Sequence, residues 1–358
     1  MNRRSVLALL AATPLAAQTA AARGWADEGA AHPVAAAWEA WKDAHLDESG
    51  RVIDRLQGLV SHSEGQGYGM TLAERMGDQP AFEAMFRWTE ENLAVRPDAL
   101  LAWRWAPDAP NPVADSNNAS DGDLFYAWAL MRAAVRFDRP EWHSRAEAIT
   151  RDLEAKCVVD FPGHTGAFLF LPGAFGFELE TGYVINPSYY MLRAMEDLGK
   201  AYGAPRLVTA AANGDVLLAE LARMGPVPDW VEVTESGLSR SEQFSANSGY
   251  EALRVPLWMI WSRKPEHPAL TTAFRPETAR ELSGELAATV VDYKTGAVLE
   301  TSTEPGYRAV SSLAACMVQN QPGSAMPPFD PEQTYYPGTL HLFAFLAQIE
   351  VTPECFPL

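Results

Sequence analysis

Cysteine is scarce in this chain of 358 residues, and its three cysteines, Cys157, Cys316 and Cys355, lie far apart. No two of them form a Cys-x-x-Cys pair, which excludes a zinc ribbon and a thioredoxin-type motif. At most one disulfide can form. Because a free cysteine behaves as a small hydrophobic residue, we expect a buried free thiol at each position rather than a bridge.

The common signatures of catalysis and nucleotide binding are also missing. The sequence has no Gly-x-Ser-x-Gly elbow, no phosphate-binding Gly-Lys-Ser/Thr loop and no dinucleotide fingerprint, which argues against the commonest hydrolases, NTPases and redox enzymes. Its seven histidines show no His-Glu-x-x-His pattern, so metal catalysis has little support. Carboxylates remain as the chemical groups, and we expect neither a metal nor a cofactor.

Positive charge is in short supply, with 28 Lys and Arg against 46 Asp and Glu and a net charge of −18. This balance argues against nucleic acid or an anionic membrane surface as a partner and favours a neutral or cationic ligand. Aromatic rings are plentiful, with 11 Trp and 11 Tyr. Such rings suit the apolar faces of pyranose sugars, although most of them are expected in the core.

A membrane-spanning helix needs roughly 18 consecutive apolar residues. No run of this length occurs beyond the N-terminus, so no membrane insertion is expected. Residues 1–22 combine Arg3 and Arg4 with a short Ala-rich apolar stretch. This pattern predicts a signal peptide, and its two arginines also resemble a twin-arginine export signal. We therefore expect a periplasmic or secreted protein.

The apolar spacing after residue 34 is helical far more often than alternating, which predicts an all-α protein. No stretch has the composition of an interdomain linker, so residues 23–358 are expected to form one domain. Weaker helical patterns near Thr71 and Leu101 raise the predicted number of helices from ten to twelve. Strand-like pieces at 167–171 and 292–297 are expected to be hairpins. The ten clearer helices are predicted at residues 36–45, 80–93, 121–137, 142–158, 187–202, 207–224, 249–262, 277–291, 307–317 and 338–350.

The most informative segment, residues 61–70, reads Ser-His-Ser-Glu-Gly-Gln-Gly-Tyr-Gly-Met and sets Glu64 among three glycines and two rings. Glycines allow a close approach of the backbone to a ligand. A glutamate partly screened from water by neighbouring rings would have a raised pKa, as a general acid requires.

A second polar segment, residues 115–124, places Asp121 and Asp123 at the start of an apolar helix. Clusters of this kind are often helix caps and nothing more. The segment lacks the central Gly and closing Glu of an EF-hand, so a calcium site of that type is excluded.

Together these segments resemble glycoside hydrolase family 8. The resemblance rests on Ser-Glu-Gly-Gln-Gly-Tyr-Gly-Met at 63–70, Ala-Ser-Asp-Gly-Asp at 119–123 and Asn-Pro-Ser-Tyr-Tyr at 186–190, in this order. Further matches at 37–42, 101–105, 171–173 and 228–230 extend it over nearly everything after the predicted signal peptide. Within the family, the chain looks most like the periplasmic endoglucanases encoded with bacterial cellulose synthases.

The resemblance implies an (α/α)6 barrel of six inner and six outer helices with an open cleft. It also implies endo-acting hydrolysis of cellulose-like β-1,4-glucan with inversion, in which one carboxylic acid protonates the leaving oxygen and a second carboxylate activates water. Glu64 falls on the family's proton donor, and Asp121 on the aspartate that contacts and helps distort the sugar. The implied partners are cellulose, cello-oligosaccharides and, as a further candidate, a cellulose synthase complex.

The chain departs from the family at the general base, where Tyr-Asp-Ala-x-Arg is usual and this sequence has Tyr250-Glu251-Ala252-Leu253-Arg254. Three alternatives follow: Glu251 serves as the base after a small backbone shift, Asp121 has taken over the role, or activity is low. We prefer Glu251, because its carboxylate can accept a proton as well as that of Asp can.

Sugar-binding positions of the family fall on Trp103, Tyr189 and Tyr250, and Arg254 follows the base position, where it could orient Glu251. The family also contains xylanases and chitosanases, so these substrates stay open. With an altered base, a weakly catalytic or non-catalytic glucan-binding component of cellulose export is a further alternative.

Overall fold

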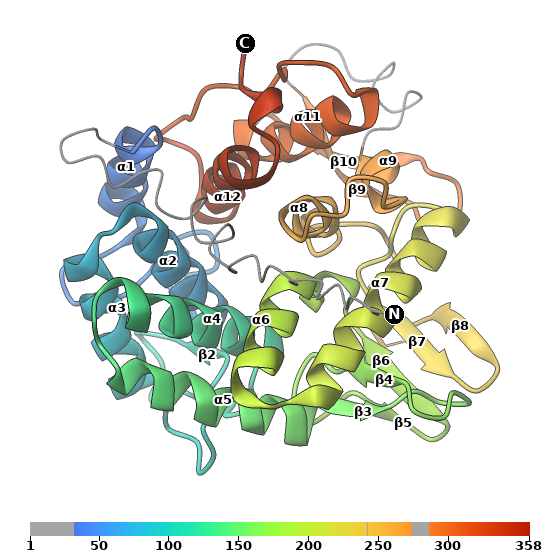
Figure 1. The fold of residues 1–358 in the computed structure, drawn as a ribbon, viewed down its shortest axis with the longest axis horizontal. Helices are drawn as coiled ribbons and strands as arrows, with labels where there is room; N and C mark the ends of the chain where they lie inside the picture. The colour runs from blue at the N-terminus through green and yellow to red at the C-terminus, as the bar shows by residue number, and fades with distance from the viewer. Residues whose placement is uncertain (1–31, 242, 274–285) are drawn as a thin grey trace, which may run out of the picture.

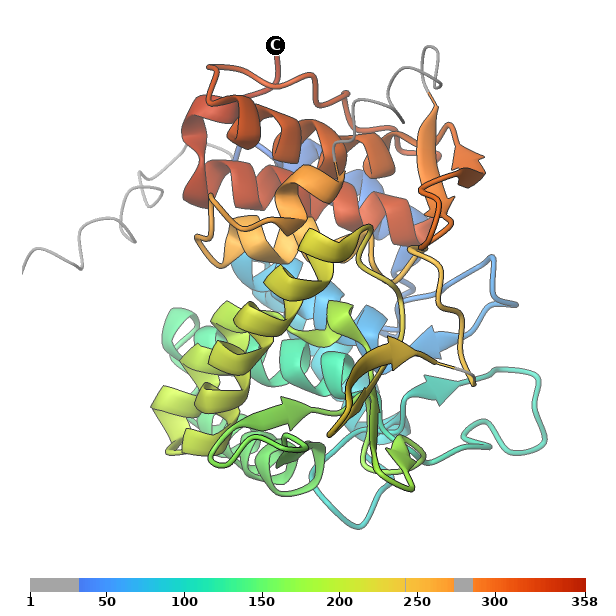
Figure 2. The ribbon, with the colours of Figure 1, turned by 90° about the vertical axis from the view of Figure 1, so that its right-hand side faces the viewer.

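The computed structural model describes residues 32–241, 243–273 and 286–358, and these form a ring of α-helices with short strands at one end (Figures 1 and 2). Among the described helices, none is both long and apolar enough to cross a bilayer. The α-helices are α1 (Ala35–His45), α2 (Ser63–Met76), α3 (Gln79–Asn92), α4 (Ser120–Arg136), α5 (Glu141–Cys157), α6 (Leu192–Tyr202), α7 (Pro205–Met224), α8 (Arg254–Trp261), α9 (Ala269–Ala273), α11 (Pro305–Gln319) and α12 (Tyr335–Val351).

The ring has an inner and an outer layer that alternate along the chain. In the inner layer α2 packs on α4, α4 on α6, α6 on α8 and α8 on α12, and α12 returns to α2 and closes the ring. Helices α2, α4, α8 and α12 are buried along most of their length. The outer helices α1, α3, α5 and α7 bury only one face, as expected for amphipathic helices that cover a core.

Short antiparallel strands and 3-10 turns complete the described chain. Strands β5 to β8 form one four-stranded sheet, and β1–β2, β3–β4 and β9–β10 form separate two-stranded pairs. Figure 2 shows the strands on one side of the ring. Their bounds are β1 (Ser61–His62), β2 (Arg104–Trp105), β3 (Val158–Asp160), β4 (Phe168–Phe170), β5 (Glu178–Leu179), β6 (Gly182–Ile185), β7 (Val231–Thr234), β8 (Gly237–Arg240), β9 (Ala287–Val291) and β10 (Val298–Ser302), with η1 at Pro187–Tyr189 and η2 at Pro353–Cys355.

Seven of the ten clearer helix predictions and the weak one near Thr71 correspond to α-helices of similar extent. The helix expected at 187–202 is divided, because the Asn186 side chain caps a 3-10 turn and regular α-helix begins only at Leu192. The helix expected at 249–262 begins at Arg254. The weak helical pattern near Leu101 is wrong, since this stretch is a loop that leads into β2.

The helix predicted at 277–291 is wrong for residues 287–291, which form β9 and pair with β10. Three of these five residues, Thr289, Val290 and Val291, are β-branched, which favours a strand. Residues 277–285 lie outside the described residues. The hairpin predicted at 167–171 is confirmed as β4 paired with β3, and residues 292–297 form the turn between β9 and β10.

The core at the centre of the ring is rich in aromatic side chains from the inner helices. Tyr68 contacts Phe125 and Phe343 with ring centroids 4.7 and 5.1 Å apart, and Phe125 contacts Trp258 at 5.1 Å. Six of the tryptophans are less than 2% exposed. Most of the tryptophans are therefore core residues, as the sequence predicts.

Two glycines bring the inner helices α2 and α4 into backbone contact. A Cβ on Gly67 would lie 2.9 Å from the Gly122 carbonyl oxygen, and a Cβ on Gly122 would lie 2.7 Å from the Glu64 amide nitrogen. Larger residues would separate the helices at this point. The glycines therefore place the N-termini of α2 and α4, with Glu64 and Asp121, side by side.

The cysteine expectation is wrong for two of the three residues. Cys316 on α11 is bonded to Cys355 in η2, with their Cα atoms 5.9 Å apart, and only Cys157 is a buried free thiol. The sequence could not show that the final turn folds back on α11, because this contact depends on the tertiary path of residues 320–355.

Removing this bridge with the double substitution Cys316→Ser and Cys355→Ser should lower the free energy of unfolding by about 4 kcal/mol. The cross-link spans 39 residues of sequence, and closing such a loop restricts the unfolded chain. Urea unfolding of the wild type and the variant measures the difference, with Cys157→Ala as the matched control. Equal stability of wild type and double variant would contradict the prediction.

At the C-terminal ends of α2 and α12, a network of ion pairs joins the two helices. Glu350 accepts hydrogen bonds from Arg75 Nε at 2.6 Å and from Arg193 Nη1 and Trp261 Nε1 at 3.0 Å. Burial alone would raise the pKa of Glu350, but the neighbouring arginines lower this pKa to about 2. The network ties the end of the ring to its beginning.

The substitution Glu350→Ala should cost about 3 kcal/mol, because it leaves Arg75 and Arg193 without a shared carboxylate in a largely buried place. The lowered pKa means that this stabilisation is complete above the ordinary carboxyl pKa of about 4.5 and is lost as the pH falls towards 2. Thermal unfolding of the wild type and Glu350→Gln between pH 3 and 7 tests this. The gap between them should narrow as the pH falls, and a constant gap would contradict it.

Candidate active site

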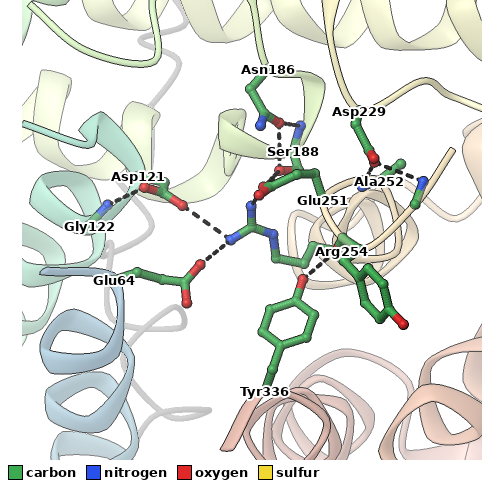
Figure 3. A network of polar contacts seen from close by, with 12 residues as sticks. Glu64, Asp121, Gly122, Asn186, Ser188, Asp229, Glu251, Ala252, Arg254 and Tyr336 are labelled. Atoms are coloured by element: carbon green, nitrogen blue, oxygen red, sulfur yellow. Dashed lines mark hydrogen bonds and ion pairs between the residues drawn. The ribbon is translucent and has the colours of Figure 1, made fainter. Parts of the chain in front are cut away.

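The site lies where three inner segments present carboxylates to one arginine (Figure 3). Glu64 comes from the first turn of α2, Asp121 from the first turn of α4, and Glu251 from the turn that leads into α8. Arg254 is the first residue of α8 and its side chain is 1% exposed. The structure thus brings together four residues that are up to 190 positions apart in sequence.

Arg254 makes contact with all three carboxylates through its two terminal nitrogens. Nη1 donates to Glu64 Oε2 at 2.6 Å, to Asp121 Oδ2 at 3.1 Å and to the Tyr68 hydroxyl at 2.8 Å. Nη2 donates to Glu251 Oε2 and to Ser188 Oγ, the latter at 2.7 Å. Charge-assisted bonds of this kind fix the geometry of the acids as well as their charge.

Access to water separates the three carboxylates. The side chain of Asp121 is 4% exposed, that of Glu64 is 21% exposed and that of Glu251 is 35% exposed. Glu251 is thus the acid most open to an incoming water molecule. Asp121 is the most enclosed, and its second oxygen accepts from the Gly122 amide at 2.7 Å.

Electrostatics favour a protonated state in this cluster. Burial raises the pKa of Asp121 to about 8 against the opposing charge of Arg254, and the nearby charges of Glu64 and Glu251 add to the rise. Burial likewise raises the pKa of Glu64, with Glu251 adding to it. One arginine cannot neutralise three carboxylates, so the cluster retains a proton near neutral pH.

Tyrosines of α12, which the sequence reasoning did not single out, complete the surroundings of the acids. Tyr335 donates its hydroxyl to Glu64 Oε1 at 3.1 Å, and the Tyr336 hydroxyl donates to the Tyr250 carbonyl at 2.5 Å. The available signal was a Tyr-Tyr pair just before a Pro at a helix start. The helix predicted from the sequence at 338–350 begins after these tyrosines, so the prediction did not place them on it.

Ser188 was also overlooked, although it lies in a segment that carries the family resemblance. Its hydroxyl lies 3.2 Å from Glu251 Oε2 and 2.7 Å from Asn186 Oδ1. The division of the predicted helix at Asn186 therefore has a consequence for the site, because the 3-10 turn directs Ser188 at Glu251.

The proposed sugar platforms are spread around this cluster. The Tyr189 ring lies 5.6 Å from the Arg254 guanidinium carbon. Trp103 lies next to the start of α2, where its carbonyl accepts from the Ser63 amide at 3.0 Å. Tyr250 is 43% exposed and donates its hydroxyl to Glu300 at 3.1 Å.

The ring of Trp103 is held in a fixed orientation. Its ring is parallel to that of His62, with centroids 6.2 Å apart, and its Nε1 donates to Asp115 at 2.9 Å. Burial lowers the pKa of His62 to about 4. His62 is therefore neutral near neutral pH and packs against Trp103 as an uncharged ring.

No group of three or more His, Cys, Asp or Glu residues that could hold a metal ion occurs in the part of the chain that the structure describes. The reactive groups that the structure brings together are three carboxylates around one arginine, inside a ring of helices. Such a cluster can supply the acid and the base that hydrolysis of a glycosidic bond requires.

The chain belongs to glycoside hydrolase family 8, since the model of Glycosyl hydrolases family 8 matches residues 1–350. A probable endoglucanase of Novacetimonas hansenii is 34% identical over 345 residues, which cover 94% of this chain and 97% of that protein. The family resemblance inferred from the sequence is confirmed.

Solved structures agree with the fold. An endo-β-1,4-glucanase from Acetobacter xylinum, CMCax, is 32% identical with a TM-score of 0.79, covering 90% of this chain and 99% of that one. The family 8 endoglucanase Cel10 from Klebsiella pneumoniae is 31% identical with a TM-score of 0.77, covering 88% of this chain and 99% of that one. The predicted (α/α)6 barrel is confirmed.

Proposed function

We propose that this protein is an endo-β-1,4-glucanase that hydrolyses cellulose-like glucan with inversion of the anomeric carbon. The observation that carries the proposal is the convergence of Glu64, Asp121 and Glu251 on Arg254. Relatives and structural neighbours named as endoglucanases or endo-β-1,4-glucanases support this substrate.

Glu64 is the proposed general acid. Burial raises its pKa, which favours the protonated form that a general acid needs, and the hydrogen bonds from Arg254 and Tyr335 hold both its oxygens in place. A protonated carboxyl in this position can donate to the glycosidic oxygen as the bond to the anomeric carbon breaks.

Glu251 is the proposed general base. It is the most exposed of the three acids, and Arg254 and Ser188 hold one of its oxygens, so the other can accept a proton from the attacking water. Asp121 is enclosed and is proposed to contact the sugar at the cleavage point rather than to activate water. Trp103, Tyr189 and Tyr250 are proposed platforms for neighbouring sugar rings.

The protein is also proposed to act outside the cytoplasmic membrane. Residues 1–22 have the pattern of a signal peptide of the Sec or twin-arginine type, and residues 23–358 are proposed as a single catalytic domain whose core runs from α1 to α12. A role beside a cellulose synthase complex in the periplasm rests on the resemblance of the motifs alone.

Viscosity and reducing ends measured together on carboxymethylcellulose test the activity of the mature protein. An endo-acting enzyme lowers viscosity well before reducing ends accumulate, and inversion is checked by NMR of the first cello-oligosaccharide product, which should be the α-anomer. Xylan and chitosan are assayed in parallel. Binding of glucan without cleavage would instead identify a non-catalytic glucan-binding protein.

A further inference from the structure

The turn that carries Glu251 is held by a carboxylate that does not belong to the cluster around Arg254. Asp229 lies just before β7 and is 7% exposed. One of its oxygens, Oδ1, accepts from the Gly249 amide at 2.8 Å and from the Ala252 amide at 2.9 Å. The two donors, Gly249 and Ala252, flank Tyr250 and Glu251 in sequence, and Figure 3 shows Asp229 beside Ala252.

The same segment is fixed on two further sides. The Asp229 amide donates to the Asn247 carbonyl at 2.8 Å. Ser248 exchanges two backbone hydrogen bonds with Val291 of β9, at 2.8 and 3.0 Å. The chain segment that leads to Glu251 is therefore bound to β9. Among the described residues, Asp229 is the only side-chain acceptor for the Gly249 and Ala252 amides.

Close packing makes this arrangement specific to the residues present. A Cβ on Gly249 would lie 2.6 Å from Asp229 Oδ2, which is too short for any real contact, so residue 249 must be glycine while Asp229 keeps its place. Regular α-helix begins only at Arg254. Before it, the chain forms turns in which the Leu253 amide donates to the Gly249 carbonyl at 3.1 Å and the Arg254 amide to the Glu251 carbonyl at 3.2 Å. Asp229 holds these turns in place from outside them, through the Gly249 and Ala252 amides.

We propose that Asp229 is a positioning residue that holds Glu251 at the distance from the substrate that water attack requires, an inference that rests on the proposed function of Glu251. A glutamate reaches one methylene further than the aspartate usual in the family, so a small rotation of its backbone moves its carboxylate a long way. Oδ1 acts through Glu251 and touches no substrate itself.

The experiment compares Asp229→Leu, Asp229→Asn and the wild type in kcat and KM on cellohexaose. Leucine is similar in size but accepts no hydrogen bond, so kcat should fall by about 10- to 100-fold, the range expected when a catalytic group is misplaced by about 1 Å. KM should change less than about twofold. Asparagine retains Oδ1 as an acceptor and should restore kcat to within about threefold of the wild type.

Two further variants keep the test decisive. Gly249→Ala keeps the Asp229 carboxylate but displaces it, so this variant should lower kcat as Asp229→Leu does. It takes the place of the leucine variant in the test if that variant does not fold. Asp78→Ala removes a helix cap that accepts from the Ala81 amide at 3.1 Å on α3; it should lower the melting temperature without changing kcat.

The outcomes separate this inference from the proposed function. If the wild type cleaves cellohexaose and Asp229→Leu retains its kcat, the positioning role is overturned and the function stands. An Asp229→Asn variant as slow as Asp229→Leu would also overturn it, because the hydrogen-bond acceptor would then not be what matters. A wild type that cleaves no β-glucan overturns the function itself.

Discussion

Replacing Glu64 by Gln is expected to lower kcat on β-1,4-glucan by about 10³-fold, within the range that general acid catalysis contributes. Glutamine has the size of glutamate, and its oxygen can still accept from Arg254 or Tyr335, but it has no acidic proton. Cello-oligosaccharide binding, measured by calorimetry, should therefore stay within about threefold of the wild type.

A substrate that needs no acid makes the test specific. A cellobioside with a 2,4-dinitrophenyl leaving group departs without protonation, so Glu64→Gln should cleave it at a rate close to that of the wild type. Glu235→Gln in the exposed turn between β7 and β8 is the matched control and should behave as the wild type on both substrates. If Glu64→Gln loses both activities equally, Glu64 has a role other than proton donation.

Several outer helices of the ring could be predicted because their starts have strong local signals. Helix α3 has Asp78 as a cap and a proline in its first turn, and α7 also begins at a proline. These patterns depend only on neighbours in sequence. The strand β9 was missed because the helical spacing before residue 287 was extended into it, where three β-branched residues instead pair with β10.

The acids of the site could be located in sequence, but their arrangement could not. Glu64 stands out because glycines surround it, and Asp121 because it lies in a polar segment at a helix start. Gly67 and Gly122 allow the contact between α2 and α4 that makes the two acids neighbours. Asp229 carries no such signal, because the amides it binds are 20 and 23 residues away. Tyr335 is 271 residues from Glu64 and meets it only when α12 closes the ring.

The second large effect is expected at Glu251, where replacement by Gln should lower kcat by about 10²- to 10³-fold with little change in KM. Glutamine can still accept from Arg254 and Ser188 and so keeps the turn in place. It cannot take a proton from water at neutral pH. Steady-state kinetics on cellohexaose measure the loss.

Exogenous azide distinguishes Glu251 from Asp121 as the base. Truncation of a general base leaves room for a small anion that needs no deprotonation, so azide should accelerate Glu251→Ala and give an α-glycosyl azide, the product of attack with inversion. The side chain of Asp121 is 4% exposed and is held by Arg254 and the Gly122 amide, so Asp121→Ala should stay slow in azide. If azide instead restores Asp121→Ala and not Glu251→Ala, Asp121 activates the water, and the longer side chain at position 251 serves only to orient Arg254.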